Sequence, residues 1–254
     1  MWDRPDILDR ISGALVALAL LLAAYGALQL AVRLPLFALR EVRVGGTLAH
    51  VTGEQIRDVV RGELRGNFFT LDLAAARAAF EKLPWVRTVT VRRQWPGRLE
   101  VTLEEHVPLA RWGNAALVNT YGEVFEAAYD GKLPLFGGPP GTAKEVTIQY
   151  EYFRKSLATI GKVPEQIWVS PRRAWQVRLE GGMTLELGRE QIEARFARFV
   201  AAYERTLGRL ARRIEYVDLR YANGFAVRIP ELKSGEAGKP APPSRRGGAQ
   251  RAAA

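Results

Sequence analysis

The chain has 254 residues, no cysteine and a formal net charge of +10 at pH 7. Without cysteine it can form neither a disulfide framework nor a thiolate metal site. A basic balance of this size suits anionic lipid headgroups or an acidic partner, and the alternative interpretation is a solvated basic surface without a specific partner. We expect no nucleic-acid partner, because the chain lacks a basic motif interleaved with aromatic residues.

The first predicted element is a transmembrane helix over Ile11–Val32, a run without a charged residue. At 1.5 Å of rise per residue this helix is about 33 Å long, close to the thickness of the hydrocarbon core. A buried core helix rarely runs so far without a charge. A signal peptide would need a cleavage site at the end of the run, and Ala17-Leu18-Ala19 lies too early for one.

Charge does not orient this span. Arg4 and Arg10 precede it, and Arg33, Arg40 and Arg43 follow it. The positive-inside rule therefore gives no direction, although a large C-terminal domain can be translocated regardless of nearby charge.

The next block predicts a small α+β module with the order strand, helix, helix, strand, strand. Thr52 and Gln55 have the spacing of a capping box, and Asp72 can cap a second helix that ends before Pro84. Apolar residues alternate with polar ones in the segments that should be strands. These strands cover residues 39–44, 86–93 and 98–105, and we expect them to form one sheet with both helices on one face.

The remaining folded block, residues 107–230, predicts a mixed β domain. Short strands are expected at 115–119, 124–125, 167–169, 175–179 and 183–187, with a final hairpin of 214–221 and 225–229. Apolar steps of three and four predict helices over 144–160 and 191–210, and the second helix carries arginines away from its apolar stripe. The tail, 231–254, is rich in Gly, Ala, Pro and Arg, so we expect it to be disordered.

No catalytic or metal-binding constellation is evident. His50 and His106 lie in different segments, and none of the five serines sits in a nucleophile elbow. The loop 138–145 resembles a phosphate-binding loop, but Ala143 and Glu145 replace the glycine and the hydroxyl residue that such a loop requires. We therefore expect no enzyme activity, no cofactor, no metal and no small-molecule substrate.

The last predicted strand, 225–229, precedes the tail and is expected to form a sheet edge. An exposed edge can pair with a strand from another chain, with backbone hydrogen bonds supplying affinity. Tyr221 and Phe225 are the large side chains nearest the turn. The alternative interpretation is that they are core residues of an ordinary last strand.

Several motifs resemble the FtsQ/DivIB family of bacterial cell-division proteins over nearly the whole chain. Three segments resemble the POTRA domain of that family: Leu83-Pro84-Trp85-Val86, the strand that ends in Arg92-Arg93-x-Trp95-Pro96, and Glu105-x-Val107-Pro108. Two further segments resemble the β domain of that family: residues 119–125 and Tyr216-Val217-Asp218-Leu219-Arg220-Tyr221. The strand and helix order predicted above is also the order of a POTRA domain.

The resemblance implies an α+β architecture with an N-terminal transmembrane helix, a POTRA module (β-α-α-β-β) and a C-terminal mixed β domain with an amphipathic helix. It divides the chain into a cytoplasmic N-terminus (1–10), the helix (11–32), the POTRA domain (37–106), the β domain (107–230) and the tail (231–254). The bulk would then be periplasmic, with the protein in the inner membrane at the division septum.

The resemblance also implies function. Family members are non-catalytic scaffolds that recruit other division proteins and hold the FtsB/FtsL pair, which helps to control septal peptidoglycan synthesis. The FtsB contact would lie along the last hairpin, and the POTRA domain would dock other division proteins. The matching positions are Tyr221, Asn223, Gly224, Phe225, Ala226 and Val227.

Two other classes of protein are weighed against this interpretation. A POTRA-containing secretion or outer-membrane assembly factor would carry a cleaved signal and a long run of alternating barrel strands. A membrane-anchored wall enzyme would need a catalytic constellation. The sequence shows neither pattern, so we expect a binding protein.

Overall fold

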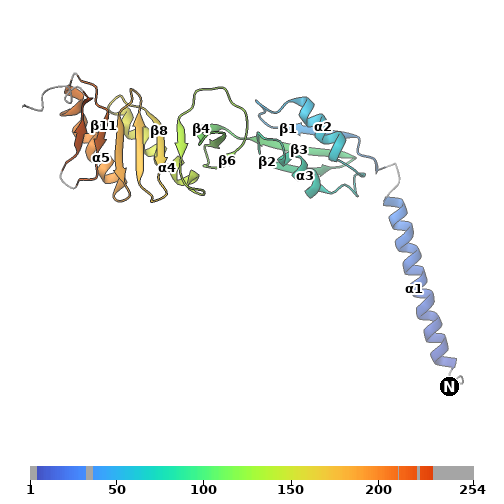
Figure 1. The fold of residues 1–254 in the computed structure, drawn as a ribbon. Helices are drawn as coiled ribbons and strands as arrows, with labels where there is room; N and C mark the ends of the chain where they lie inside the picture. The colour runs from blue at the N-terminus through green and yellow to red at the C-terminus, as the bar shows by residue number, and fades with distance from the viewer. Residues whose placement is uncertain (1–4, 33–36, 211, 222–223, 231–254) are drawn as a thin grey trace, which may run out of the picture. The chain divides into compact units, whose positions relative to one another are not determined.

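The computed structural model describes residues 5–32, 37–210, 212–221 and 224–230 (Figure 1). The predicted tail lies outside the described residues, as does Asn223. The chain divides into two compact units, which are described separately. The first unit holds the chain up to Leu109 together with 115–120 and 124–130, and the second holds the remainder.

Helix α1 (Pro5–Val32) matches the predicted span. Within it, Asp9–Val32 is long and apolar enough to cross a membrane, and its large apolar side chains are exposed rather than packed against protein. An apolar helix without protein around it is consistent with a membrane anchor. The polar groups near its end pair with each other, since the Gln29 side-chain amide donates to the Tyr25 hydroxyl at 2.9 Å.

The first unit contains the predicted β-α-α-β-β module. Its strands β1 (Glu41–Gly45), β2 (Val86–Gln94) and β3 (Arg98–Glu105) form a sheet in the order β1-β3-β2. β3 runs parallel to β1 and antiparallel to β2. Helices α2 (Gly53–Glu63) and α3 (Leu73–Glu81) connect β1 to β2, so the predicted α+β class and element order are confirmed.

Local chemistry explains where these helices begin. The Thr52 hydroxyl accepts from the Gln55 backbone, and the Gln55 side chain accepts from the Thr52 backbone, which is the predicted capping box. The Asp72 carboxylate accepts from two backbone amides in the first turn of α3. The alternating strands place Val89, Leu99, Val101 and Leu103 in the core, while Glu100, Thr102 and Glu104 face outward.

Glu105, at the end of β3, holds the loop that leads into α2. Its carboxylate accepts from the backbone amides of Ala49, His50 and Val51 at 2.8–3.1 Å, and it lies 3.1 Å from Nδ1 of His50. Burial by itself would raise the pKa of Glu105. The amide hydrogen bonds outweigh that effect and lower the pKa below its ordinary value, because they stabilise the ionised carboxylate.

The two histidines serve packing in this unit. The His50 ring stacks on Trp85 at 3.7 Å between centroids, and the His106 ring stacks on Phe125 at 4.1 Å. Phe125 belongs to a short hairpin of β5 (Ala116–Asn119) and β6 (Val124–Phe125). The two histidines are thus part of an aromatic cluster that also includes Tyr129.

The second unit is built on one mixed sheet, whose strands lie in the order β12-β11-β10-β9-β8-β7-β4. The predicted hairpin of β9 and β10 turns through Gly181 and Gly182, whose φ angles of +88° and +89° favour glycine. The strand bounds are β4 (Pro108–Trp112), β7 (Leu135–Gly137), β8 (Pro164–Val169), β9 (Trp175–Leu179), β10 (Thr184–Gly188), β11 (Tyr216–Asp218) and β12 (Ala226–Arg228).

Helices α4 (Ala143–Ala158) and α5 (Ile192–Tyr203) cover one face of this sheet. Beneath them, one residue from each neighbouring strand forms a continuous apolar row with at most 1% exposure. The row is Phe136, Ile167, Val177, Leu185 and Val217. Phe153 of α4 and Phe196 of α5 meet above it with ring centroids 4.5 Å apart.

The structure corrects two details of the sequence prediction. Strands β4 and β7 were not expected, because each is short and has little alternation. The predicted helix over 191–210 ends at Tyr203, and a separate 3-10 turn covers Leu207–Arg209. The Thr206 amide and hydroxyl both bond to the Ala202 carbonyl, and the turn that follows buries Leu207.

We predict that Glu105→Ala frees the loop before α2. Three backbone amides lose their acceptor, so hydrogen exchange at Ala49, His50 and Val51 should become faster on the order of a hundredfold. Because the Glu105 pKa is lowered by folding, its stabilising effect is present above its unfolded pKa and is lost as the pH falls through the folded value.

Mass spectrometry of exchanging amides measures this effect. Glu100→Gln is the matched control, since Glu100 is exposed on the opposite face of the same strand. Unchanged exchange in the Glu105→Ala protein would show that the carboxylate does not hold the loop.

Candidate partner-binding surface

Strand β12 lies at one end of the sheet in the second unit. It pairs antiparallel with β11, and no other described strand pairs with it. The backbone along its outer side is therefore available for an added strand. The predicted edge strand is thus observed over Ala226–Arg228, which is shorter than the expected 225–229.

The pairing of β12 with β11 decides which way its side chains face. Val227 lies opposite Val217, so it extends the apolar row beneath the helices and is half-buried. Ala226 lies opposite the buried Asp218 and is exposed on the other face. The strand therefore presents small and polar groups on one face and apolar groups on the other.

Phe225 lies just before β12 and contacts α5. Its ring is 6.5 Å from the buried Phe199 ring, at an interplanar angle of 73°, and it is half-buried. Tyr221 is 58% exposed and Gly224 is exposed. Tyr221 is therefore not a core residue, whereas Phe225 lies between core and surface.

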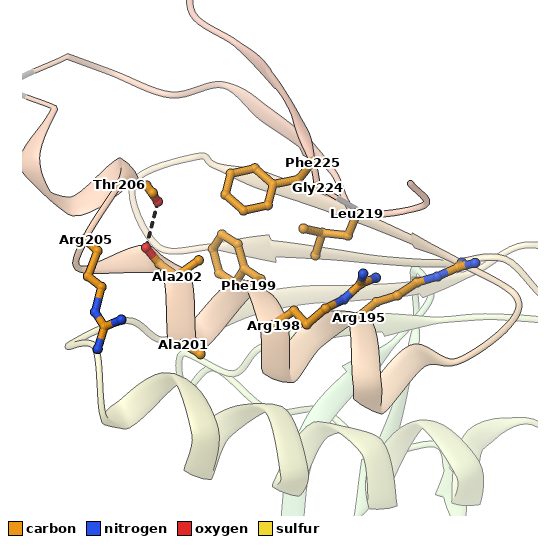
Figure 2. Close-up of a pocket in the computed structure, with 10 residues that line it drawn as sticks. All are labelled: Arg195, Arg198, Phe199, Ala201, Ala202, Arg205, Thr206, Leu219, Gly224 and Phe225. Atoms are coloured by element: carbon orange, nitrogen blue, oxygen red, sulfur yellow. Dashed lines mark hydrogen bonds between the residues drawn. The ribbon is translucent and has the colours of Figure 1, made fainter. Parts of the chain in front are cut away.

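A hollow of about 640 Å³ opens between α5 and the last hairpin (Figure 2). Figure 2 shows Phe199, Leu219 and Phe225 converging at its centre, with arginine side chains from α5 along its side. The apolar residues come from three separate segments, so the hollow forms only when α5 packs beside the hairpin. Ala202 and Thr206 continue the lining toward the end of the helix.

Three arginines give the hollow a positively charged rim. Arg195 donates to the Leu187 carbonyl at 2.7 Å, and Arg198 donates to the Tyr221 carbonyl at 3.3 Å. Both therefore also tie α5 to the sheet and to the hairpin. Arg205 is exposed in the chain that leaves α5.

An ion pair braces β11 on the opposite face. The Arg220 guanidinium bonds both carboxylate oxygens of Asp218, with the shortest distance 2.6 Å from Nη2. These hydrogen bonds lower the pKa of the buried Asp218 carboxyl, although burial acts against them. Next to it, burial and then the Asp218 charge raise the pKa of Glu186, despite the opposing charge of Arg220.

The sequence alone does not place the α5 residues at this surface. Arg195, Arg198, Phe199 and Arg205 line the hollow with Phe225, yet they lie 20 or more residues earlier in the chain. The arginines outside the apolar stripe of the helix were the available signal. Among the described residues, no group of three or more His, Cys, Asp or Glu side chains could hold a metal ion.

Comparison with known families agrees with this architecture. The model of the FtsQ-type POTRA domain matches residues 37–106, and the model of the C-terminal region of cell division protein FtsQ/DivIB matches residues 110–220. A membrane-anchored, POTRA-bearing protein of bacterial cell division is therefore the class that the fold defines.

Relatives named cell division protein FtsQ match almost the full chain. The protein of Nitrosospira multiformis is 48% identical over 90% of this chain and 99% of its own length. The protein of Burkholderia pseudomallei is 47% identical over 92% of this chain and 96% of its own length. The chain belongs to the FtsQ/DivIB family, which favours division over the secretion alternative.

We predict that Asp218→Asn destabilises the protein, whereas Glu186→Gln does not. Asp218→Asn weakens the ion pair between the buried Asp218 carboxylate and the exposed Arg220 guanidinium, and it should cost about 1–2 kcal/mol. Glu186 has a raised pKa, so its charge disfavours the folded state once the pH exceeds its unfolded pKa. Glu186→Gln should therefore be neutral or slightly stabilising at pH 7.

Urea unfolding of the two purified variants at pH 7 compares these effects. Repeating it at pH 4 should shrink the effect of Glu186→Gln, because the raised pKa of Glu186 brings that carboxyl close to its neutral form. The effect of Asp218→Asn should largely persist at pH 4, because the pKa of Asp218 is lowered and its contribution is lost only as the pH falls through the folded value. Equal destabilisation by the two variants would contradict the assigned roles.

Proposed function

We propose that this protein is a non-catalytic scaffold of the division machinery and that it binds the FtsB/FtsL pair through β12 and the adjacent hollow. One observation carries the proposal: β12, which pairs with β11 alone among the described strands, lies beside an apolar hollow rimmed by arginines. The family supports a role in cell division. Beyond that role, we propose that the protein binds FtsB and FtsL and helps to control septal peptidoglycan synthesis.

The geometry suits one extended segment of a partner. Backbone hydrogen bonds to β12 would supply affinity, and alternate side chains of the added strand would supply selectivity. An apolar side chain that enters the hollow would contact Phe199 and Phe225. Acidic side chains beside it would face Arg195, Arg198 and Arg205, so the preferred segment is an acidic and amphipathic one.

We further propose the topology and the partition of the chain. The N-terminus would lie in the cytoplasm, and the two folded units would lie in the periplasm at the septum. The POTRA domain (37–106) would dock other division proteins, and the β domain (107–230) would hold FtsB. A topology reporter fused after Arg33 tests the direction of the span.

We predict that Phe225→Glu weakens binding of the soluble part of an FtsB-like partner at least about tenfold, because a charge would enter an apolar contact. Pull-down or titration with the purified partner measures the effect. Ile148→Glu is the matched control: it places the same charge on an exposed residue of α4. Equal binding by both variants would contradict the assignment.

Crosslinking in growing cells tests the same surface without a fold-changing substitution. A photoreactive residue at Gly224 or Ala226 should capture a division protein, while one at Ile148 should not. Failure to capture any division protein from either position of the hairpin would count against the proposal.

We predict that Arg205→Glu lowers affinity for the partner mainly by slowing association. A charge on the rim of an interface attracts an oppositely charged partner before contact and so raises the association rate. The difference from the unaltered protein should shrink as the salt concentration rises, since salt screens exposed charges. Arg172→Glu is a suitable control, because Arg172 is exposed in the turn after β8, away from the residues of the hollow. Stopped-flow kinetics at two salt concentrations measures the effect.

A further inference from the structure

An aromatic cluster gathers at one end of the POTRA sheet. Phe37 contacts Phe69 at 4.9 Å between ring centroids, and Phe68 contacts both Phe69 at 5.2 Å and Trp95 at 5.6 Å. The segments that carry these rings are joined by backbone bonds, since the Phe68 amide donates to the Phe37 carbonyl and the Arg40 amide donates to the Gly97 carbonyl.

The outer members of this cluster are left in solvent. Trp95 is 65% exposed and Phe69 is 46% exposed, whereas Phe68 between them is buried. A small hollow of about 160 Å³ lies beside Trp95, lined by Phe37, Phe68 and Arg40. Two large exposed aromatic rings on one buried support form a surface that is ordered before anything binds.

Exposed arginines surround these rings. Arg40 and Arg61 line one groove together with Gly66, and Arg65 directly precedes that glycine. All three arginines are exposed, and none makes an ion pair with a described residue. The basic groups that follow α3 are paired instead: Arg87 lies 2.9 Å from the Glu104 carboxylate, and Lys82 lies 3.3 Å from the Glu63 carboxylate. Glu41, the carboxylate that lines the same groove, is paired with Arg43 and Arg98, so Arg40, Arg61 and Arg65 remain as exposed positive charges beside the rings.

Chain connectivity keeps this end close to the membrane span. Helix α1 ends at Val32, and Phe37 follows five residues later. A fully extended chain of that length reaches at most about 18 Å. Phe37 is itself a member of the cluster, so the aromatic rings are tethered near the surface of any bilayer that α1 crosses.

We propose that this surface, the Trp95 patch (Phe37, Arg40, Arg61, Arg65, Phe69 and Trp95), binds the anionic lipid surface next to the span. Tryptophan rings favour the headgroup level of a bilayer, and arginines are attracted to anionic headgroups. The short tether makes the contact intramolecular, so weak individual contacts suffice. The contact would fix the orientation of the POTRA domain on the membrane, and it does not depend on the proposed FtsB site.

The test uses the full chain in lipid vesicles that contain no other protein. Because the sequence lacks cysteine, one introduced cysteine carries one fluorescent label. Gln94→Cys labels the exposed position next to Trp95, and Thr47→Cys labels an exposed position at the opposite end of the same sheet. Lipids with a nitroxide near the headgroup quench a label that touches the bilayer surface, and aqueous iodide quenches a label in water.

We expect nitroxide to quench the label at 94 at least about twofold more than the label at 47, because only the label at 94 would touch the headgroup level of the bilayer. Iodide should do the reverse. Adding phosphatidylglycerol to phosphatidylcholine should increase the difference. The double variant Arg40→Gln/Arg65→Gln should reverse that increase, since each arginine shifts the docked population about fivefold. Trp95→Gln should reduce quenching in both kinds of vesicle.

Two results would overturn the proposal. One is equal quenching of the labels at 94 and 47 in vesicles that contain phosphatidylglycerol, with the fold shown to be intact by circular dichroism. The other is protection of the label at 94 that arises only after another division protein is added, because the patch would then bind protein. Equal quenching of the label at 94 with and without phosphatidylglycerol would overturn the role of the arginines.

Discussion

The candidate binding surface depends on one buried apolar row. Phe136, Ile167, Val177, Leu185 and Val217 each come from a different strand, and they are covered by α4 and α5. Burying such side chains contributes about 1.5–3 kcal/mol each. The row fixes the register of the five strands that contribute to it, because a slip by one residue would move a row side chain to the opposite face.

The row also organises what lies at the sheet edge. Its register places Val227 under the helices and leaves Ala226 on the open face. Phe225 then reaches Phe199, and the arginines of α5 come to lie beside the hairpin (Figure 2). A surface made of an open edge and a charged hollow is therefore a consequence of core packing.

The POTRA module shows the same dependence of surface on interior. Its sheet buries Leu99, Val101 and Leu103, and it leaves Trp95 and Phe69 exposed at one end. At the other end, the charge of Glu105 is used internally to hold a loop. At one end of the module the charged group is thus used in internal hydrogen bonds, and at the other end aromatic rings and arginines are exposed to a ligand.

The sequence by itself determined the local elements, because periodicity and capping act between near neighbours. The span, the capping box at Thr52, the strands 98–105 and 175–179, and the family could all be predicted from residues close together in the chain. Only the tertiary structure decided that α5 and the last hairpin share a hollow, that Glu105 binds three distant amides, and that strands as short as β4 and β7 exist. Each of these depends on packing between segments far apart in sequence, and a short strand is stabilised by its neighbours more than by its own residues.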